Sequence, residues 1–359
     1  MTLRTEDLVS RGLVAPERLD ALRRVGEEFA VAVTDEMAAL IDPSDPVDPI
    51  AAQFVPSVAE LENAPDDQPD PIGDERWSPL PGIVHRYPDR VLIKPILTCP
   101  VYCRFCFRRE QVGKGNGVLA PAALDRAFGY IAEHPEIWEV IVTGGDPFLL
   151  SPRRISSIVR RIEEIHHVAV MRFHTRVPVA DPRRVGAALV AALAADKAVY
   201  VVVHANHPRE LTPAMREAVG RLVRAGIPVL SQSVLLRGIN DDPAVLEALL
   251  RGLVAMRVKP YYLHHPDLAR GTGHFRLGIA DGQALVGALR GRVSGLCQPS
   301  YVLDIPGGYG KVPIAASAAS AAGPGERPGC WVVEDPAGGK HAYPPPEPQA
   351  SPAGPRARR

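Results

Sequence analysis

Six short apolar runs, rich in β-branched residues, alternate with stretches of helical spacing through the middle of the chain. The runs span residues 90–97, 139–143, 168–173, 198–203, 228–233 and 259–264. The helical stretches span residues 124–132, 155–165, 183–195, 213–225 and 244–256. Parallel strands need a crossover connection, usually a helix, so this alternation favours a parallel sheet. Runs that are apolar on both faces indicate strands that are covered on both sides.

The alternation predicts an α/β fold in which six βα units form a partial, TIM-like (β/α)6 barrel over residues 85–300. No G-x-G-x-x-G fingerprint is present to favour a dinucleotide-binding sheet instead. In barrels of this kind the chemistry takes place at the C-terminal ends of the strands. Residues that directly follow an apolar run are therefore the first candidates for a functional site.

The remaining segments are predicted to flank the barrel. Residues 1–84 should form an N-terminal helical cap, with Leu19, Leu22, Val25 and Phe29 at helical spacing, followed by an extended proline-rich arm. Residues 301–346 should form a glycine-rich loop that ends in a lysine, and a C-terminal hairpin that pairs residues 331–334 with 340–343. Residues 347–359 are expected to be a disordered tail.

Three of the five cysteines, Cys99, Cys103 and Cys106, lie directly after the first apolar run. Thiolates are soft ligands, and three of them on one short loop suit three corners of a [4Fe–4S] cluster. The fourth iron is then left to chelate the amino and carboxylate groups of S-adenosylmethionine (SAM). This C-x3-C-x2-C spacing after a strand resembles the signature of radical SAM enzymes.

The alternatives for these cysteines are weaker. A zinc site usually takes a fourth Cys or His ligand nearby, and this spacing is an unusual start for one. A disulfide inside so tight a loop is disfavoured by geometry, and an odd number of cysteines leaves one thiol over. Buried structural cysteines would show this spacing only by chance. The pattern therefore favours an iron–sulfur cluster.

The charge balance and apolar content limit the partners that the chain would bind. Lys+Arg and Asp+Glu both number 41, so no net charge attracts nucleic acid or an anionic membrane. No run of eighteen apolar residues and no signal-peptide core is present. Five cysteines in 359 residues do not make a disulfide framework. We therefore expect a cytoplasmic protein with neither a nucleic-acid nor a membrane partner.

Two glycine-containing stretches add further candidates. Gly144, Gly145 and Asp146 follow the second apolar run, where glycine lets a ligand approach the backbone. Radical SAM proteins carry a Gly-Gly-Glu-like element at this place, so we expect these three residues to contact SAM, with Asp146 in place of Glu. Lys311 ends a second glycine-rich loop and would suit either a covalent link to pyridoxal 5′-phosphate (PLP) or a phosphate contact. A Walker P-loop is disfavoured, because the G-K-[ST] ending is missing.

From about residue 41 to residue 313 the chain resembles the lysine 2,3-aminomutase family, which are PLP-dependent radical SAM enzymes. Besides the cysteine loop, the matching segments are 85–91, 206–208, 232–241, 260–262, 274–276 and 306–311. The resemblance implies an isomerase that converts L-lysine to β-lysine by a radical 1,2-amino shift, with a [4Fe–4S] cluster, SAM and PLP as cofactors. It also implies an external one-electron reductant of the flavodoxin or ferredoxin type, and a homo-oligomer.

The cofactor-binding residues are carried over from this resemblance one at a time. The three cysteines match the cluster ligands, and Lys311 matches the catalytic lysine that holds PLP. Arg90 matches the arginine at the PLP phosphate, where a planar guanidinium suits the dianion, and Tyr87 is expected beside the same cofactor. His204 and Gln232 fall at barrel positions that are expected to line the SAM pocket.

Three further residues concern the substrate. Arg108 matches the arginine expected to bind the substrate carboxylate, while Asp267 and Asp304 match the pair of acids that bind the ε-ammonium of lysine. Relatives that act on glutamate lack this pair, since it would repel a side-chain carboxylate. Three alternatives stay open: a paralogue that makes β-lysine for elongation factor P, an enzyme for arginine, and a radical SAM reaction without PLP. An alternative outside this class is a non-catalytic iron–sulfur redox protein.

Overall fold

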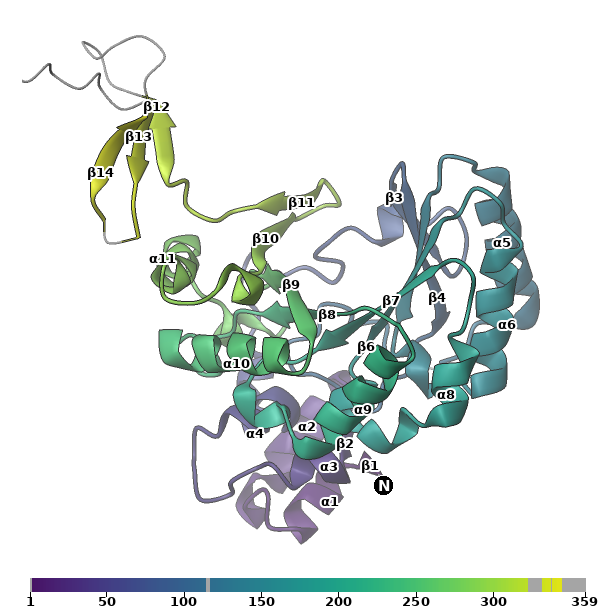
Figure 1. Cartoon of the computed structure of the whole chain (residues 1–359). Helices are drawn as coiled ribbons and strands as arrows, with labels where there is room; N and C mark the ends of the chain where they lie inside the picture. The colour runs from purple at the N-terminus through teal and green to yellow at the C-terminus, as the bar shows by residue number, and fades with distance from the viewer. Residues whose placement is uncertain (1, 114–116, 322–330, 337, 344–359) are drawn as a thin grey trace, which may run out of the picture.

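The computed structural model describes residues 2–113, 117–321, 331–336 and 338–343, and its centre is a curved sheet surrounded by helices (Figure 1). The sheet has nine strands in the order β11-β10-β9-β8-β7-β6-β5-β4-β3. All six predicted strands are present, and each pairs in parallel with the next. They are β4 (Arg90–Ile96), β5 (Glu139–Gly144), β6 (Val170–Thr175), β7 (Ala198–His204), β8 (Val229–Val234) and β9 (Val258–His264). The predicted partial barrel is confirmed.

Three strands that the sequence analysis did not predict extend this sheet. β3 (Ile83–Tyr87) pairs antiparallel with β4, β10 (Ser300–Ile305) pairs in parallel with β9, and β11 (Gly310–Pro313) returns antiparallel to β10. The predicted domain boundaries at 84/85 and 300/301 thus fall inside β3 and β10. We therefore propose that the barrel unit spans residues 83–313.

Helices connect successive strands, and most of them begin where the sequence supplies a start signal. Each of the four longer helices has a proline in its first turn, where the missing N–H costs nothing. They are α5 (Pro121–Glu133), α6 (Pro152–Glu163), α9 (Pro213–Arg224) and α10 (Pro243–Ala255). Three of them are also N-capped by a side-chain oxygen, from Ser151, Thr212 and Asp242.

The single helix predicted for residues 183–195 was wrong. The chain there forms α7 (Val177–Ala180), a short 3-10 turn at Pro182–Arg184 and then α8 (Ala187–Ala192). Gly186 has an extended backbone (φ −87°, ψ 177°), which interrupts the helical path before α8 begins. After β9, α11 (Ile279–Leu289) leads back to β10.

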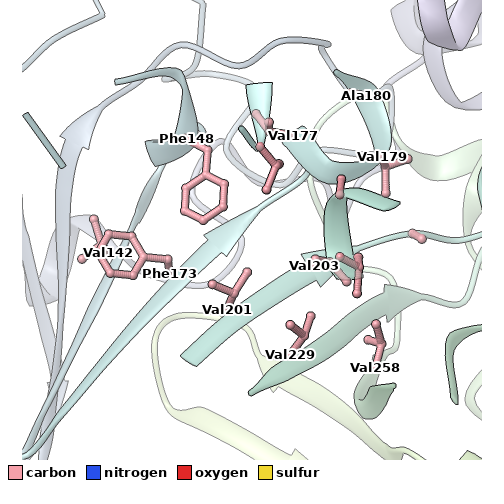
Figure 2. Packing of buried hydrophobic residues seen from close by; sticks show 14 of the residues in the cluster. Val142, Phe148, Phe173, Val177, Val179, Ala180, Val201, Val203, Val229 and Val258 are labelled. Carbon is pink, nitrogen blue, oxygen red and sulfur yellow. The ribbon is translucent and has the colours of Figure 1, made fainter. Parts of the chain in front are cut away.

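The strands present different side chains on their two faces. Val142, Phe173, Val201, Val229 and Val258 are register partners on five successive strands, and all five are buried. Figure 2 shows this row packed in the apolar cluster with Phe148 and Val177. Burying one such side chain contributes about 1.5–3 kcal/mol. The opposite face carries polar residues and lines a cavity, so the prediction that both faces are apolar holds for only one of them.

The N-terminal segment forms the predicted cap against one end of the barrel, but from short pieces. α1 (Thr5–Ser10), α2 (Leu19–Glu28), α3 (Asp35–Ala38) and α4 (Pro49–Phe54) alternate with loops, and β1 (Thr2–Leu3) pairs with β2 (Val33–Thr34). The Thr34 hydroxyl donates to the carbonyl of Ala180 at 2.6 Å, which ties the cap to α7. No helix among the described residues is long and apolar enough to cross a membrane.

The C-terminal hairpin is also confirmed. β13 (Trp331–Glu334) and β14 (Lys340–Tyr343) pair antiparallel, and β12 (Ala319–Ala321) adds a third strand. Figure 1 shows this small sheet standing away from the barrel beyond β11. The predicted tail at 347–359 lies outside the described residues.

Candidate active site

A cavity of about 620 Å³ runs from Arg90 and Glu139, at the starts of β4 and β5, to the cysteine loop after the end of β4, and collects almost all of the predicted site residues. Only Gly144, among those residues, is absent from its lining. The others line the cavity together: Tyr87, Arg90, Cys99, Cys103, Cys106, Arg108, Gly145, Asp146, His204, Gln232, Asp267, Asp304 and Lys311. Residues spread over more than 220 positions of sequence therefore meet in one space.

Buried ion pairs stabilise the cysteine loop. Glu60 is fully buried and forms ion pairs with Arg104, at 2.5 Å, and with Arg109. Burial raises the pKa of the Glu60 carboxyl, but the two guanidinium groups outweigh burial and lower it. Arg104 and Arg109 alternate with the cysteines in sequence, so this ion-pair cluster holds the loop in place.

The three thiols fit a cluster better than a single ion. Burial, together with the neighbouring Asp146 and the other thiols, raises the pKa of Cys99 well above its usual range. Burial and the nearby Cys103 raise the pKa of Cys106 to about 11. Thiols in such a place ionise only when bound metal supplies positive charge. No three His, Cys, Asp or Glu side chains in the described part of the chain converge on one ion. A [4Fe–4S] cluster does not need this, because each thiolate binds a different iron.

Arg176 is a neighbour of the cysteines that the sequence analysis missed. Its guanidinium donates to the Cys103 sulfur at 2.7 Å and to Glu210 and Gln53, each also at 2.7 Å. Arg176 follows β6 and stands over the ring of Phe105, with 5.5 Å between the guanidinium carbon and the ring centre.

The Gly144–Gly145–Asp146 stretch packs tightly against the cysteine loop. Gly144 has φ +109°, and a Cβ on Gly145 would lie only 2.4 Å from the carbonyl oxygen of Thr98, so both positions require glycine. The Asp146 carboxylate accepts hydrogen bonds from the Thr175 hydroxyl and from the main-chain N–H groups of residues 148, 176 and 177. It is 3% exposed. Its carboxylate is thus committed to the neighbouring loop, which differs from the expected acid that faces SAM.

His204 and Gln232 lie side by side, as register partners on β7 and β8. The His204 ring stacks on Phe105, with 5.6 Å between ring centres. Burial and Arg176 keep the pKa of His204 well below its usual range, so the imidazole is neutral. The Nε2 atoms of His204 and of His174 are buried, and neither has a hydrogen-bond partner among the described residues. Buried polar atoms without partners are rare in proteins, and on a cavity wall they indicate a bound polar ligand.

Lys311 reaches the same cavity from the opposite side. Its ammonium contacts the Asp304 carboxylate and lies 3.2 Å from Nδ1 of His264. Its main-chain N–H donates to the Tyr87 hydroxyl at 2.7 Å, and the Arg90 guanidinium stacks on the Tyr87 ring at 3.7 Å. Tyr87 thus links Lys311 to Arg90, and both residues line the same cavity.

The glycine-rich turn before Lys311 is held by residues of the arm. Gly307 and Gly308 have φ values of +80° and +83°, which only glycine adopts freely. The Trp77 indole N–H donates to the Gly308 carbonyl at 2.9 Å. This places β11 so that Lys311 stands opposite Asp304 in the register of the β10–β11 hairpin.

The two candidate substrate acids differ in their surroundings. Asp304 lies within β10. Burial acts to raise its pKa, but the hydrogen bond with His264 and the Lys311 ammonium outweigh burial and lower it strongly. Asp267 follows β9 and has neither a hydrogen bond nor an ion pair within the described residues. Burial, and then Asp304, raise the pKa of Asp267 from 3.8 to about 7.

Arg108 is connected to Asp304 through residues that the sequence analysis missed. Its Nε donates to Asp74 at 2.8 Å, and Arg86 spans from Asp74, at 3.3 Å, to Asp304, at 3.4 Å. Arg86 lies within the segment 85–91 that matched the aminomutase family. Asp74 lies in the irregular arm, where no sequence pattern marked it. The sequence analysis also missed His264, the last residue of β9.

Comparison with known proteins agrees with this arrangement. The family model of the radical SAM superfamily matches residues 93–249. The L-lysine 2,3-aminomutase of Acetoanaerobium sticklandii is 40% identical over 301 residues, which cover 84% of this chain and 73% of that protein. The corresponding enzyme of Clostridium subterminale is 39% identical over 298 residues, 83% of this chain and 72% of its own.

A relative named for another substrate is nearly as similar. The glutamate 2,3-aminomutase of Clostridioides difficile is 38% identical over 293 residues, which cover 82% of this chain and 69% of that protein. Overall identity therefore does not distinguish the two substrates, and the residues of the site must do so. On the family match and these identities, the chain belongs to the lysine 2,3-aminomutase family of the radical SAM superfamily.

Proposed function

We propose that the chain interconverts L-lysine and β-lysine by a radical 1,2-amino shift. The observation that carries this proposal is the content of a single cavity: three cysteine thiols on one wall, Lys311 on another, and the acids Asp267 and Asp304 beside Lys311. When bound, the [4Fe–4S] cluster with SAM would supply a 5′-deoxyadenosyl radical, and PLP would supply an aromatic ring that stabilises the migrating radical.

Residues of the chain would bind the three cofactors. Cys99, Cys103 and Cys106 would hold the cluster. Lys311 would hold PLP covalently, with Arg90 at the phosphate, because a guanidinium fork binds a phosphate dianion through two hydrogen bonds. Gly145, His204 and Gln232 would line the SAM side of the cavity.

The substrate would be held at both of its ends. Arg108 would bind the carboxylate, since Asp74 holds its guanidinium at 2.8 Å through Nε and leaves the other nitrogens as donors. Asp267 and Asp304 would bind the ε-ammonium. The Lys311 ammonium is the cation that Asp304 contacts in this structure. Once Lys311 is committed to the cofactor, the two acids require another cation, and the side chain of lysine supplies one.

The acid pair also favours lysine over glutamate. A substrate carboxylate placed beside the buried Asp304 and the partly buried Asp267 would be repelled, and nothing would offset the cost of removing it from water. A guanidinium, like an ammonium, forms ion pairs with carboxylates, so arginine is the second substrate to test. An enzyme that makes β-lysine for elongation factor P would catalyse the same reaction, and only the later use of the product would differ.

The test is anaerobic reconstitution with iron, sulfide, PLP and SAM, followed by amino-acid analysis after incubation with L-lysine, L-arginine or L-glutamate. We expect β-lysine to form only when all cofactors and a reductant are present. We expect no product from the Lys311→Ala variant, which serves as the matched control. Conversion of glutamate in preference to lysine would refute the substrate assignment. A reducible cluster without SAM cleavage would indicate the redox-protein alternative.

A further inference from the structure

A second cavity, of about 350 Å³, lies against the cysteine loop and is separate from the active-site cavity. Three segments enclose it: the N-terminal strands β1 and β2, residues 98–102 of the cysteine loop, and the turn at residues 181–184. Cys99 and Pro100 line both cavities. The cysteine loop is therefore the wall between the active site and this second cavity.

Positively charged side chains dominate the exposed rim of the second cavity. Arg4, Arg183 and Arg184 belong to its lining, and all three are exposed. The Arg183 side chain is 78% exposed and forms an ion pair with Glu36. The other acid in the lining is Asp181, whose pKa is raised by burial and by Glu36. The side chains that extend furthest into solvent are thus the arginines.

Hydrogen bonds between the three segments hold this rim in shape. The main-chain N–H of Tyr102 donates to the Ala32 carbonyl at 3.0 Å, which joins the cysteine loop to the N-terminal cap. The Thr34 hydroxyl joins the cap to α7, and Arg184 donates to the Leu149 carbonyl at 3.0 Å. A surface that is already ordered loses little conformational entropy when a partner binds.

We propose that this second cavity and its arginine rim form the docking surface for an acidic one-electron carrier protein, and that the electron enters the site through Cys99. The proposal rests on the proposed function, in which Cys99 binds the cluster. The carrier would be oxidised by one electron and the cluster reduced from the 2+ to the 1+ state, with no bond made or broken. During turnover the active-site cavity is filled by SAM, PLP and substrate. The other face of the cysteine loop is the route that remains open.

The experiment measures cluster reduction and not turnover. The reconstituted protein is mixed anaerobically with a reduced, acidic flavodoxin in a stopped-flow instrument, and loss of the visible cluster absorbance is followed at low and high salt. We expect the Arg4→Glu/Arg183→Glu variant to be reduced about ten- to a hundredfold more slowly than the parent at low salt. The difference should shrink at high salt, because exposed charges are screened. Arg184 is left unchanged, since it supports the loop at Leu149.

Two controls separate the possible outcomes. Arg251→Glu/Arg292→Glu changes two exposed arginines near α10 and should be reduced by flavodoxin at close to the parent rate. Dithionite should reduce the clusters of all three proteins to the same extent. If the parent has no cluster that dithionite reduces, the proposed function fails. If dithionite acts equally but flavodoxin reduces the Arg4/Arg183 variant at the parent rate, or slows equally with the control variant, the docking surface is wrong.

A milder variant keeps the test decisive if the charge-reversal variant does not fold. Should the charge reversal prevent dithionite from reducing the cluster, Arg4→Gln/Arg183→Gln is measured in the same way. A smaller loss of flavodoxin rate, with the same dependence on salt, supports the docking surface. An unchanged rate with flavodoxin overturns it.

Discussion

Replacing Asp267 by Asn should stabilise the cofactor-free protein at alkaline pH while impairing its use of lysine. The folded-state pKa of Asp267 is about 7, against an ordinary value of 3.8. Because the folded pKa lies above the unfolded one, the contribution of Asp267 to stability is greatest below about pH 4 and is lost as pH rises to about 7. At about 1.4 kcal/mol per pKa unit, the shift corresponds to on the order of 4 kcal/mol above pH 7.

The neutral amide of Asn avoids this cost and keeps the shape of the side chain. We expect the free energy of unfolding of the Asp267→Asn variant to exceed that of the parent by about 1–4 kcal/mol at pH 8. The difference should shrink as pH falls toward 4, where the parent carboxyl is also neutral. Urea denaturation followed by circular dichroism, at pH 8 and at pH 5, measures both values.

The Asp267→Asn variant should also use lysine less efficiently. A hydrogen bond to a charged group is worth about 1.5–3 kcal/mol, so kcat/KM for lysine should fall by about ten- to a hundredfold. If Asp267 is retained for substrate binding at a cost in stability, its replacement should raise stability and lower activity together. If Asp267→Asn unfolds at a lower urea concentration than the parent at pH 8, Asp267 stabilises the chain through some other contact and the reasoning is refuted.

Asp74→Asn is the matched control. Asp74 is more deeply buried than Asp267, and it is paired with Arg108 and Arg86. Burial acts to raise its pKa, and Arg108 and the other nearby cations outweigh burial and lower it. Because the folded pKa lies below the unfolded one, Asp74 stabilises the protein above about pH 4. The Asn variant should therefore be less stable than the parent at pH 8, opposite in sign to Asp267→Asn.

Three other substitutions test separate parts of the site. Cys103→Ala should abolish the visible cluster absorbance after reconstitution, whereas Cys297→Ala should retain it, because Cys297 is buried away from the cavity; equal spectra would contradict the ligand assignment. Lys311→Ala should lose PLP on gel filtration yet keep the cluster, since the two sites share no residue, and loss of both would show that the sites are not independent. Glu60→Gln should lower the free energy of unfolding by about 3–5 kcal/mol, because Arg104 keeps a buried charge without its partner; a urea midpoint equal to that of the parent would refute this role.

The sheet could be predicted from sequence because its strands carry a repeated signal. Six short β-branched runs alternate with five stretches of helical spacing, and most of the helices begin at a start signal. β3, β10 and β11 lack that signal. β3 and β11 pair antiparallel at the two ends of the sheet and are not followed by a crossover helix. The break at Gly186 was missed because Val185 and Leu189, on either side of it, lie at helical spacing.

The site could be predicted only where its chemistry is concentrated in short stretches. The cysteines and the glycine-rich loop stand out by composition and spacing, whereas Arg90 was predicted only from the resemblance to the aminomutase family. Asp74, Arg176 and His264 carry no such signal, since each acts through a neighbour that the fold supplies. Asp74 matters because Arg108 and Arg86 reach it, and those contacts join positions 74, 86, 108 and 304. Single residues with distant partners leave no local pattern.

The β10–β11 hairpin brings together Lys311, the proposed cofactor lysine, and Asp304, a proposed substrate acid. Asp304 and Lys311 are opposite each other in the antiparallel register, so their side chains share one face of the hairpin. In the cofactor-free chain the lysine neutralises the acid. Under the proposed function, a cofactor bound to Lys311 would take the lysine nitrogen away from Asp304 and leave Asp304 and Asp267 facing the cavity as a pair. The proposed function therefore predicts that the two acids become free to bind a substrate ammonium only after Lys311 has bound the cofactor.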